Sequence, residues 1–83
     1  MKRKYKKTLE LIYKRPVSGN VQWPDVEALL CALGAEIEER EGSRVSVTLF
    51  DEVRVFHRPH PGPSTDKGAV ASIRDWLQSH KIK

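Results

Sequence analysis

The chain has 83 residues, with 15 Lys and Arg against 11 Asp and Glu, a formal net charge of +4 and one cysteine. This length suits one small domain, and a single cysteine excludes an internal disulfide and any cysteine-rich zinc site. No apolar run approaches the roughly 20 residues of a membrane span, so we expect a soluble, cytoplasmic protein without membrane contacts. The positive charge favours a polyanionic partner such as RNA or DNA.

The first predicted helix covers residues 8–15, where Leu9, Ile12 and Tyr13 fall on one face. We expect Thr8 to be its N-cap and Pro16 to end it. The basic run before it, MKRKYKK, is interpreted as a solvated arm.

The second and clearest helix begins at Pro24 and ends before Gly34. Its apolar positions form one stripe that faces a core: Val26, Leu29, Leu30 and Leu33. Cys31 lies between leucines, so we expect a buried structural thiol.

Three strand-like segments follow, in AEIEER, SRVSVTLF and EVRVFHR, each with apolar and polar residues in alternation. The expected core side carries Val45, Val47 and Leu49 from one strand and Val53, Val55 and His57 from the next. The opposite face is then open and basic, with Arg44, Arg54 and Arg58. Proline residues at 59, 61 and 63 end the third strand, because proline cannot donate to a ladder.

The last predicted helix is capped by Asp66 and packs through Val70, Ile73 and either Trp76 or Leu77. The element order α-α-β-β-β-α predicts an α+β fold, in which helices cover one face of a three-stranded antiparallel sheet.

The position of His57 depends on the turn near Asp51. A three-residue turn places it opposite Val45 at the edge of the core, whereas a two-residue turn places it opposite Ser46 and on the open face. Both registers fit the sequence.

His57 and His60 are three residues apart, which is a weak signal for zinc. The intervening Arg58 opposes a cation, and no cysteine or third histidine lies near. We therefore expect neither a metal site nor a cofactor. The simpler structural interpretation is that His60 bonds a loop carbonyl while His57 closes the core edge.

Cleavage of RNA without a metal needs a base, an acid and a cation beside the phosphate. Histidine suits the first two roles, because its pKa is near neutrality, and arginine suits the third, because it binds phosphate in a bidentate manner. The candidates that could gather at one sheet edge are Arg44, Arg54, Arg58, His57, His60 and Lys67. A solvated strand face with ordinary surface arginines explains the same residues.

Four stretches in this order resemble the HicA family of bacterial and archaeal toxins: WPDVEALLCALGAEI, EGSRVSV, the PHP that contains His60-Pro61, and KGAVASIRDWL. The resemblance runs from about Gln22 to about Ile82. It implies a double-stranded-RNA-binding-domain-like fold, endoribonuclease activity as an mRNA interferase, and a HicB-like antitoxin as partner. Contact with DNA would come only through the antitoxin. We expect a toxin domain over residues 22–83 and a basic extension with a short helix over residues 1–21.

The family's usual motif is Gly-Ser-His, and that histidine is held to be catalytic, but this chain has Gly42-Ser43-Arg44. One alternative is that His57 or His60 transfers the proton. Another is that Arg44 stabilises charge while a different group transfers the proton. The chain would then bind phosphates through Arg44, Arg54, Arg58 and Lys67. The remaining alternatives are an RNA-binding module that does not cut and a protein that only binds its antitoxin.

Overall fold

The computed structural model describes residues 2–60 and 62–82. Pro61, the second half of the His60-Pro61 motif, lies outside the described residues, as do the two chain ends, Met1 and Lys83. None of the described helices combines the length and apolar character that crossing a membrane requires.

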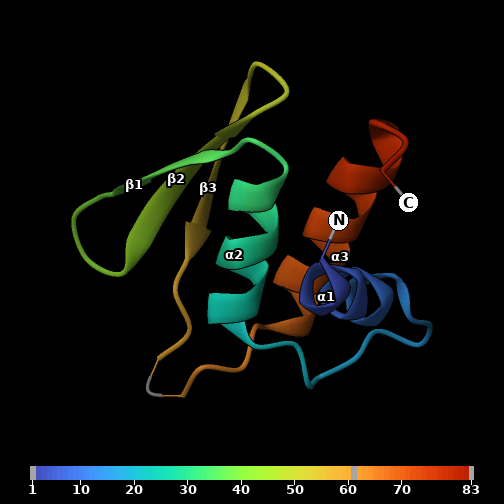
Figure 1. The fold of residues 1–83 in the computed structure, drawn as a ribbon. Coiled ribbons are helices and arrows are strands. Elements are labelled where there is room, and N and C mark those ends of the chain that lie inside the picture. The colour runs from blue at the N-terminus through green and yellow to red at the C-terminus, as the bar shows by residue number, and fades with distance from the viewer. Residues whose placement is uncertain (1, 61, 83) are drawn as a thin grey trace.

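The structure is an α+β fold in which helices cover one face of a three-stranded sheet (Figure 1). The elements are α1 (Arg3–Tyr13), α2 (Trp23–Ala32), β1 (Glu36–Glu39), β2 (Arg44–Leu49), β3 (Glu52–His57) and α3 (Lys67–Ser79). The sheet is antiparallel with the order β1-β2-β3. This arrangement confirms the predicted element order and the double-stranded-RNA-binding-domain-like architecture.

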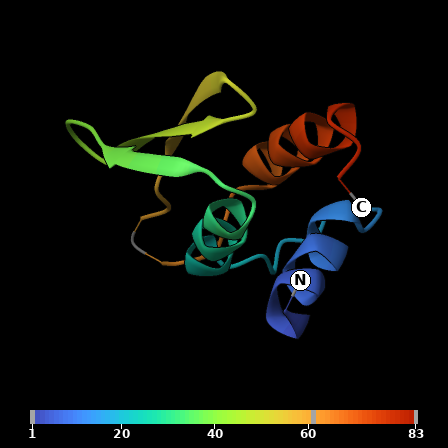
Figure 2. The ribbon, with the colours of Figure 1, turned by 45° about the horizontal axis from the view of Figure 1, so that its top comes forward.

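Helices α2 and α3 lie against the sheet, and α1 packs on these two helices on the side away from the sheet (Figure 2). The core therefore contains residues from the sheet, from α2 and α3, and from α1. Its buried apolar residues are Leu9, Ile12, Val21, Trp23, Val26, Leu29, Leu30, Val45, Val47, Leu49, Phe56, Val70, Ile73, Trp76 and Leu77.

Helix α1 begins at Arg3, well before the predicted start at Thr8, so the basic run is helical. The prediction that Thr8 is an N-cap is wrong, because its hydroxyl donates to the Lys4 carbonyl one turn earlier (3.1 Å). Lysine and arginine are good helix formers, and burial of Leu9 and Ile12 holds the helix on the core. The hydroxyl of Tyr13, whose pKa burial raises, donates to the carbonyl of Ile82.

Helix α2 follows the prediction, with proline in its first turn and Gly34 just past its end at φ 104°, where glycine is unstrained. The expectation for Cys31 is wrong: its side chain is exposed. The buried positions of this helix are Trp23, Val26, Leu29 and Leu30, and Cys31 lies outside their stripe. In α3, the Asp66 carboxylate accepts from the Ala69 N–H (3.2 Å), as predicted.

The β2–β3 turn decides which face each β3 residue occupies. It has two residues, Phe50 and Asp51, with φ values of 57° and 61°, as in a type I′ turn. This register sets Phe56 opposite Val45 on the helix side and leaves Val53 and Val55 on the open face, 61% and 56% exposed. The predicted core side of β3 is therefore wrong, because the turn shifts the strand by one residue and so reverses its faces.

Candidate functional site

Three basic side chains form one row across the open face of the sheet. Arg44 in β2 pairs directly with His57 in β3, and the N–H of Arg40, which follows β1, donates to the Arg44 carbonyl (2.9 Å). All three residues are exposed. We call them the Arg40–Arg44–His57 row.

His57 and Arg44 are close neighbours within this row. The Arg58 N–H donates to the Ser43 carbonyl (2.7 Å), just beyond the pair, so Arg44 and His57 form a non-hydrogen-bonded pair. In antiparallel sheets this kind of pair brings the side chains closer together than the hydrogen-bonded kind. The two-residue turn thus places His57 on the open face, as predicted for a turn of this length. Its partner across the strands is Arg44, however, and not Ser46 as that prediction had it.

The row borders a hollow of about 540 Å³, lined by Arg40, Glu41, Arg44 and Val55. The Nε of Arg44 donates to the Glu41 carbonyl (3.3 Å), and the Nε of Arg40 donates to the Ser46 hydroxyl (3.3 Å). Within residues 2–60 and 62–82, neither guanidinium makes an ion pair. Both groups can therefore bind an anion at this end of the sheet without first losing a carboxylate partner.

The rest of the open face is not basic. The second row holds Glu38, Ser46 and Val55, and the third holds Glu36, Thr48 and Val53. The predicted basic face is therefore reduced to one end of the sheet. The face changes along its strands from basic to acidic and apolar.

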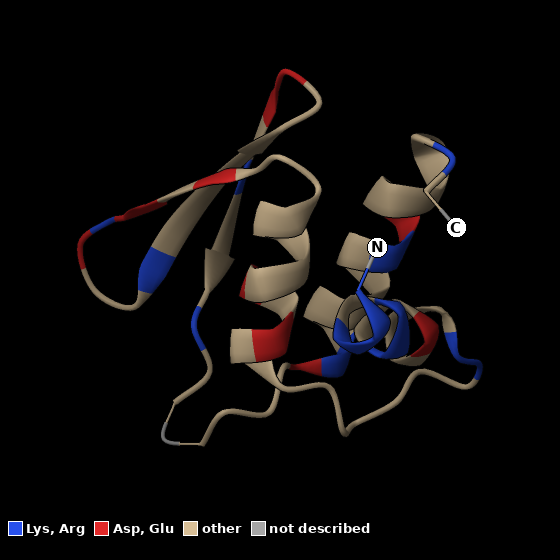
Figure 3. Ribbon diagram, in the orientation of Figure 1, with Lys and Arg blue, Asp and Glu red and all other residues tan. Residues whose placement is uncertain are grey.

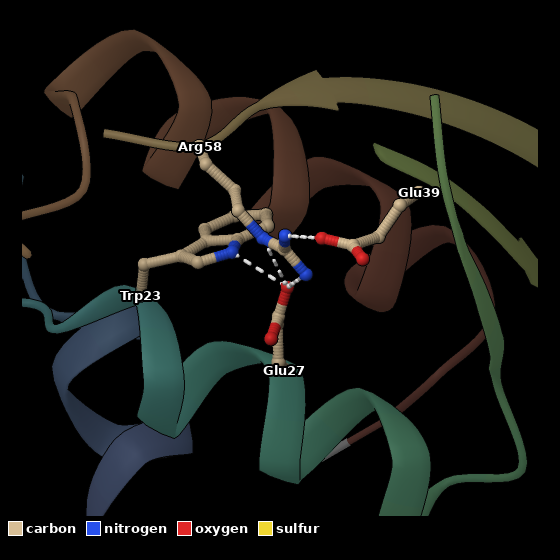
Figure 4. Close-up of polar contacts among 4 residues, drawn as sticks. All are labelled: Trp23, Glu27, Glu39 and Arg58. Atoms are coloured by element: carbon tan, nitrogen blue, oxygen red, sulfur yellow. Dashed lines mark hydrogen bonds and ion pairs between the residues drawn. The ribbon is translucent and has the colours of Figure 1, made fainter. Parts of the chain in front are cut away.

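Arg58 lies on the helix side of the sheet, held by two carboxylates (Figure 4). Its Nη1 donates to Glu39, and its Nε and Nη2 donate to the same oxygen of Glu27 (3.2 and 3.1 Å). Glu27 also accepts from the Trp23 indole N–H (2.8 Å). The hydrogen bonds that Arg58 donates to Glu39 and Glu27 raise its pKa. This arginine fastens the end of β3 to α2 and does not share the open face with Arg44.

Arg54 also points to the helix side, where its guanidinium carbon lies 5.0 Å from the centre of the Trp76 ring. This is a cation–π contact with α3. The one-residue shift of β3 therefore takes both predicted arginines, Arg54 and Arg58, off the open face.

The remaining predicted site residues lie in and after the loop that follows β3. His60 is exposed, and Lys67 is the first residue of α3, with its side chain beside Gly19. Among the residues that the structure describes, no hydrogen bond or ion pair joins either side chain to Arg44 or His57. Of the six candidates, the register brings together Arg44 and His57.

Arg40 is the residue that sequence reasoning missed. The alternation of AEIEER places position 40 on the same side as positions 36 and 38, and a turn at Gly42, where φ is 70°, returns the chain beside it. Within the described ranges, no group of three or more histidine, cysteine or acidic side chains gathers as a metal would require.

The chain matches the family model described as HicA toxin of bacterial toxin–antitoxin over residues 23–81, most of its length. It belongs to the HicA toxin family. Neither the curated proteins nor the solved structures provide a match. A HicA toxin is one member of a toxin–antitoxin pair, so the family implies an antitoxin as the kind of partner. Both the Arg40–Arg44–His57 row and the Glu27–Arg58 contact lie within the matched residues, whereas α1 precedes them.

Proposed function

We propose that this HicA toxin is a metal-independent endoribonuclease that binds mRNA at the Arg40–Arg44–His57 row and cuts it. Translation and growth then stop until a HicB-like antitoxin neutralises the toxin. The observation that carries the proposal is the register that pairs His57 with Arg44 on an exposed face. The protein would act in the cytoplasm, where mRNA is translated, and reach DNA only through its antitoxin.

The proposed reaction joins the RNA 2′-oxygen to phosphorus and breaks the bond from phosphorus to the 5′-oxygen. His57 takes the proton of the 2′-hydroxyl, because an imidazole ionises near neutral pH. Arg40 and Arg44 bind the phosphate oxygens and offset the charge that develops on them. The 5′-oxygen leaves with a proton from water or from His60.

The resemblance to HicA toxins puts the usual catalytic histidine at the position of Arg44. A guanidinium stays charged at neutral pH and does not act as a base. We infer that His57 supplies an imidazole next to this position from the neighbouring strand. Phosphate binding is assigned to Arg40 and Arg44, because Arg54 and Arg58 lie on the helix side of the sheet. There Arg54 contacts the Trp76 ring, and Arg58 pairs with Glu27 and Glu39. A role for Lys67 in binding RNA stays a prediction from the sequence.

The test is cleavage of single-stranded RNA by the purified chain with a metal chelator present. His57→Ala should lower the rate by about 100-fold or more, the usual contribution of a general base, and should leave RNA affinity nearly unchanged. Arg44→Gln should weaken both binding and cleavage. His60→Ala distinguishes water from His60 as the proton donor, because the cleavage rate of this variant falls only if His60 protonates the leaving oxygen.

Thr48→Ala is the matched control, since Thr48 lies on the same face two rows from His57, and it should cut at the wild-type rate. Wild-type cleavage by His57→Ala would remove His57 from the mechanism. If the wild-type chain gave no products with the chelator present, the metal-independent nuclease itself would be wrong.

Binding of the antitoxin without cleavage of RNA is the second candidate function, and the exposed Val53 and Val55 favour it. Apolar side chains on an open face suit a protein surface better than a phosphate backbone. The absence of cleavage products from the wild-type chain, together with antitoxin binding that Val55→Lys abolishes, would select this function over the nuclease.

A further inference from the structure

The positive charge of the chain is concentrated in its first 15 residues. Residues 2–15 hold seven of the 15 Lys and Arg and one of the 11 Asp and Glu. The other residues therefore carry eight basic and ten acidic side chains, a formal charge of −2. The part that matches the HicA family is not basic overall, so its net charge does not attract a polyanion.

The helix α1 presents these charges on a fixed surface. Its buried residues, Thr8, Leu9 and Ile12, hold one side of the helix against the core, and α1 packs against both α2 and α3. The basic side chains are exposed: Arg3, Lys4, Lys6 and Lys7 within α1, and Lys2, Lys14 and Arg15 beside its two ends. In Figure 3 much of the α1 ribbon is blue, whereas the ribbon of the sheet carries both red and blue segments.

These cations have no carboxylate partners among the described residues, where the ion pairs involve Arg58, Arg74 and His80. The one cation–π contact of the helix joins Lys4 to the ring of Tyr5 (5.2 Å). A hollow of about 370 Å³ lies between Lys7 and Lys14, with Leu11 and Glu10 as its other lining residues. The cations are therefore available to an anion from solvent.

We propose that the outward side of α1 is a second binding surface, which holds the phosphate backbone of single-stranded RNA without regard to sequence. Several unpaired cations on one rigid helix release counterions when they contact successive phosphates. A lipid surface fits less well, because an interfacial helix inserts its apolar side into the bilayer, and here that side is buried in the core. The inference rests on the proposed RNA substrate.

The two RNA-binding surfaces lie on opposite sides of the molecule, since α2 and α3 separate α1 from the sheet (Figures 1 and 2). An RNA that contacts both must reach around a body of 31 × 28 × 21 Å. Long RNA therefore uses α1 as well as the Arg40–Arg44–His57 row, whereas an oligomer too short to reach around the body binds one surface at a time.

The experiment compares RNA binding by the parent chain and by the double variant Lys6→Gln, Lys7→Gln. Both carry His57→Ala so that cleavage does not interfere, and fluorescence anisotropy follows labelled polyuridylate over a range of salt concentrations. We expect the double variant to bind on the order of tenfold more weakly at low salt. Its plot of log K against log salt should be shallower by about 1.4, at about 0.7 for each lost phosphate contact.

The matched control is Gln78→Glu, Lys81→Gln, which lowers the net charge by the same amount at exposed positions near the end of α3. This control should bind almost as tightly as the parent. An equal loss in both double variants would show an effect of total charge and overturn the proposal, as would unchanged binding in Lys6→Gln, Lys7→Gln.

Cleavage assays with His57 intact separate this inference from the nuclease proposal. Lys6→Gln, Lys7→Gln should raise KM for long RNA, keep kcat, and cut a short oligomer as the wild type does. If the chain binds RNA through α1 but never cuts it, the nuclease proposal fails and this inference stands. If it cuts RNA and the double variant keeps the wild-type KM for long RNA, this inference fails alone.

Discussion

At the scale of single residues, the arginines of this toxin divide by their partners. Arg58 is held by Glu27 and Glu39, and Arg54 lies over the ring of Trp76, so both join β3 to the helices. Arg44 and Arg40 face solvent. The residue type predicts a cation at each position, but whether a carboxylate already holds it depends on the face that it occupies.

Glu52 leads to a prediction about pH. Its carboxylate accepts from the Trp76 indole N–H (2.5 Å) and lies 3.3 Å from Nε2 of His80. The hydrogen bond from Trp76, followed by that from His80, lowers the pKa of Glu52 below its ordinary value. Because the folded state favours the ionised form, this contribution to stability is present at neutral pH and is lost as the pH falls below about 4.3, the usual glutamate pKa.

Thermal unfolding of the wild type and Glu52→Gln between pH 7 and pH 3 tests this prediction. The wild type should have the higher midpoint at pH 7, and the difference should shrink towards pH 3. Glu36→Gln, which changes an exposed carboxylate on the open face, should show no such trend. A difference between the wild type and Glu52→Gln that does not vary with pH would contradict the role of the ionised carboxylate.

At the scale of elements, β3 shows where sequence patterning stops being decisive. Its residues alternate, but both of its faces hold a large apolar side chain, Val55 on one and Phe56 on the other. Phe56 occupies the core position because its ring packs between those of Trp23 and Trp76, whose centroids lie 5.9 and 6.3 Å from its own. Phe50 in the turn also contacts the Trp76 ring of α3 (5.8 Å) and stacks on His80 just past its end (4.0 Å), so contacts with this helix support the register.

Alanine substitutions in β3 test the register directly. Phe56→Ala should cost about 3–5 kcal/mol of unfolding free energy, because it empties a buried aromatic site. Val55→Ala should cost about 0.5 kcal/mol or less, since the side chain is exposed. Urea denaturation measures both, and a larger loss for Val55→Ala would restore the face assignment that the alternation alone predicted.

At the scale of the whole molecule, α1 contributes to the same core as the toxin elements. Leu9 and Ile12 are buried in the cluster that contains the apolar residues of α2, the sheet and α3. The division into residues 1–21 and 22–83 stays a prediction about organisation. The shared core leads us to expect that both segments unfold together.

Ile12→Ala tests this expectation, because the side chain is fully buried. It should lower the unfolding free energy by about 2–5 kcal/mol and keep a single transition, followed both by circular dichroism and by the fluorescence of Trp23 and Trp76. Lys6→Ala on the exposed side of α1 should change the free energy by about 0.5 kcal/mol or less. A separate early transition in Ile12→Ala that leaves tryptophan fluorescence unchanged would mean that α1 folds independently.

Much of the fold was predictable from local patterns. The apolar stripe of α2, the cap at Asp66, the alternation of β2 and the element order all depend on residues close together in the chain, and the structure agrees with them. The candidate site was predictable in part. Arg44 and His57 were recognised by residue type, but their pairing was not. Arg40 was missed because its place beside Arg44 depends on the turn at Gly42, which returns the chain next to it.

The fold class, the likeness to HicA toxins and the excess of positive charge at the N-terminus follow from the amino-acid sequence alone, because they depend on composition, order and short-range periodicity. Which face of β3 is buried depends on the packed structure, since a one-residue change at the turn reverses every side chain of the strand. That choice put His57 beside Arg44 and placed Arg58 within reach of Glu27 and Glu39.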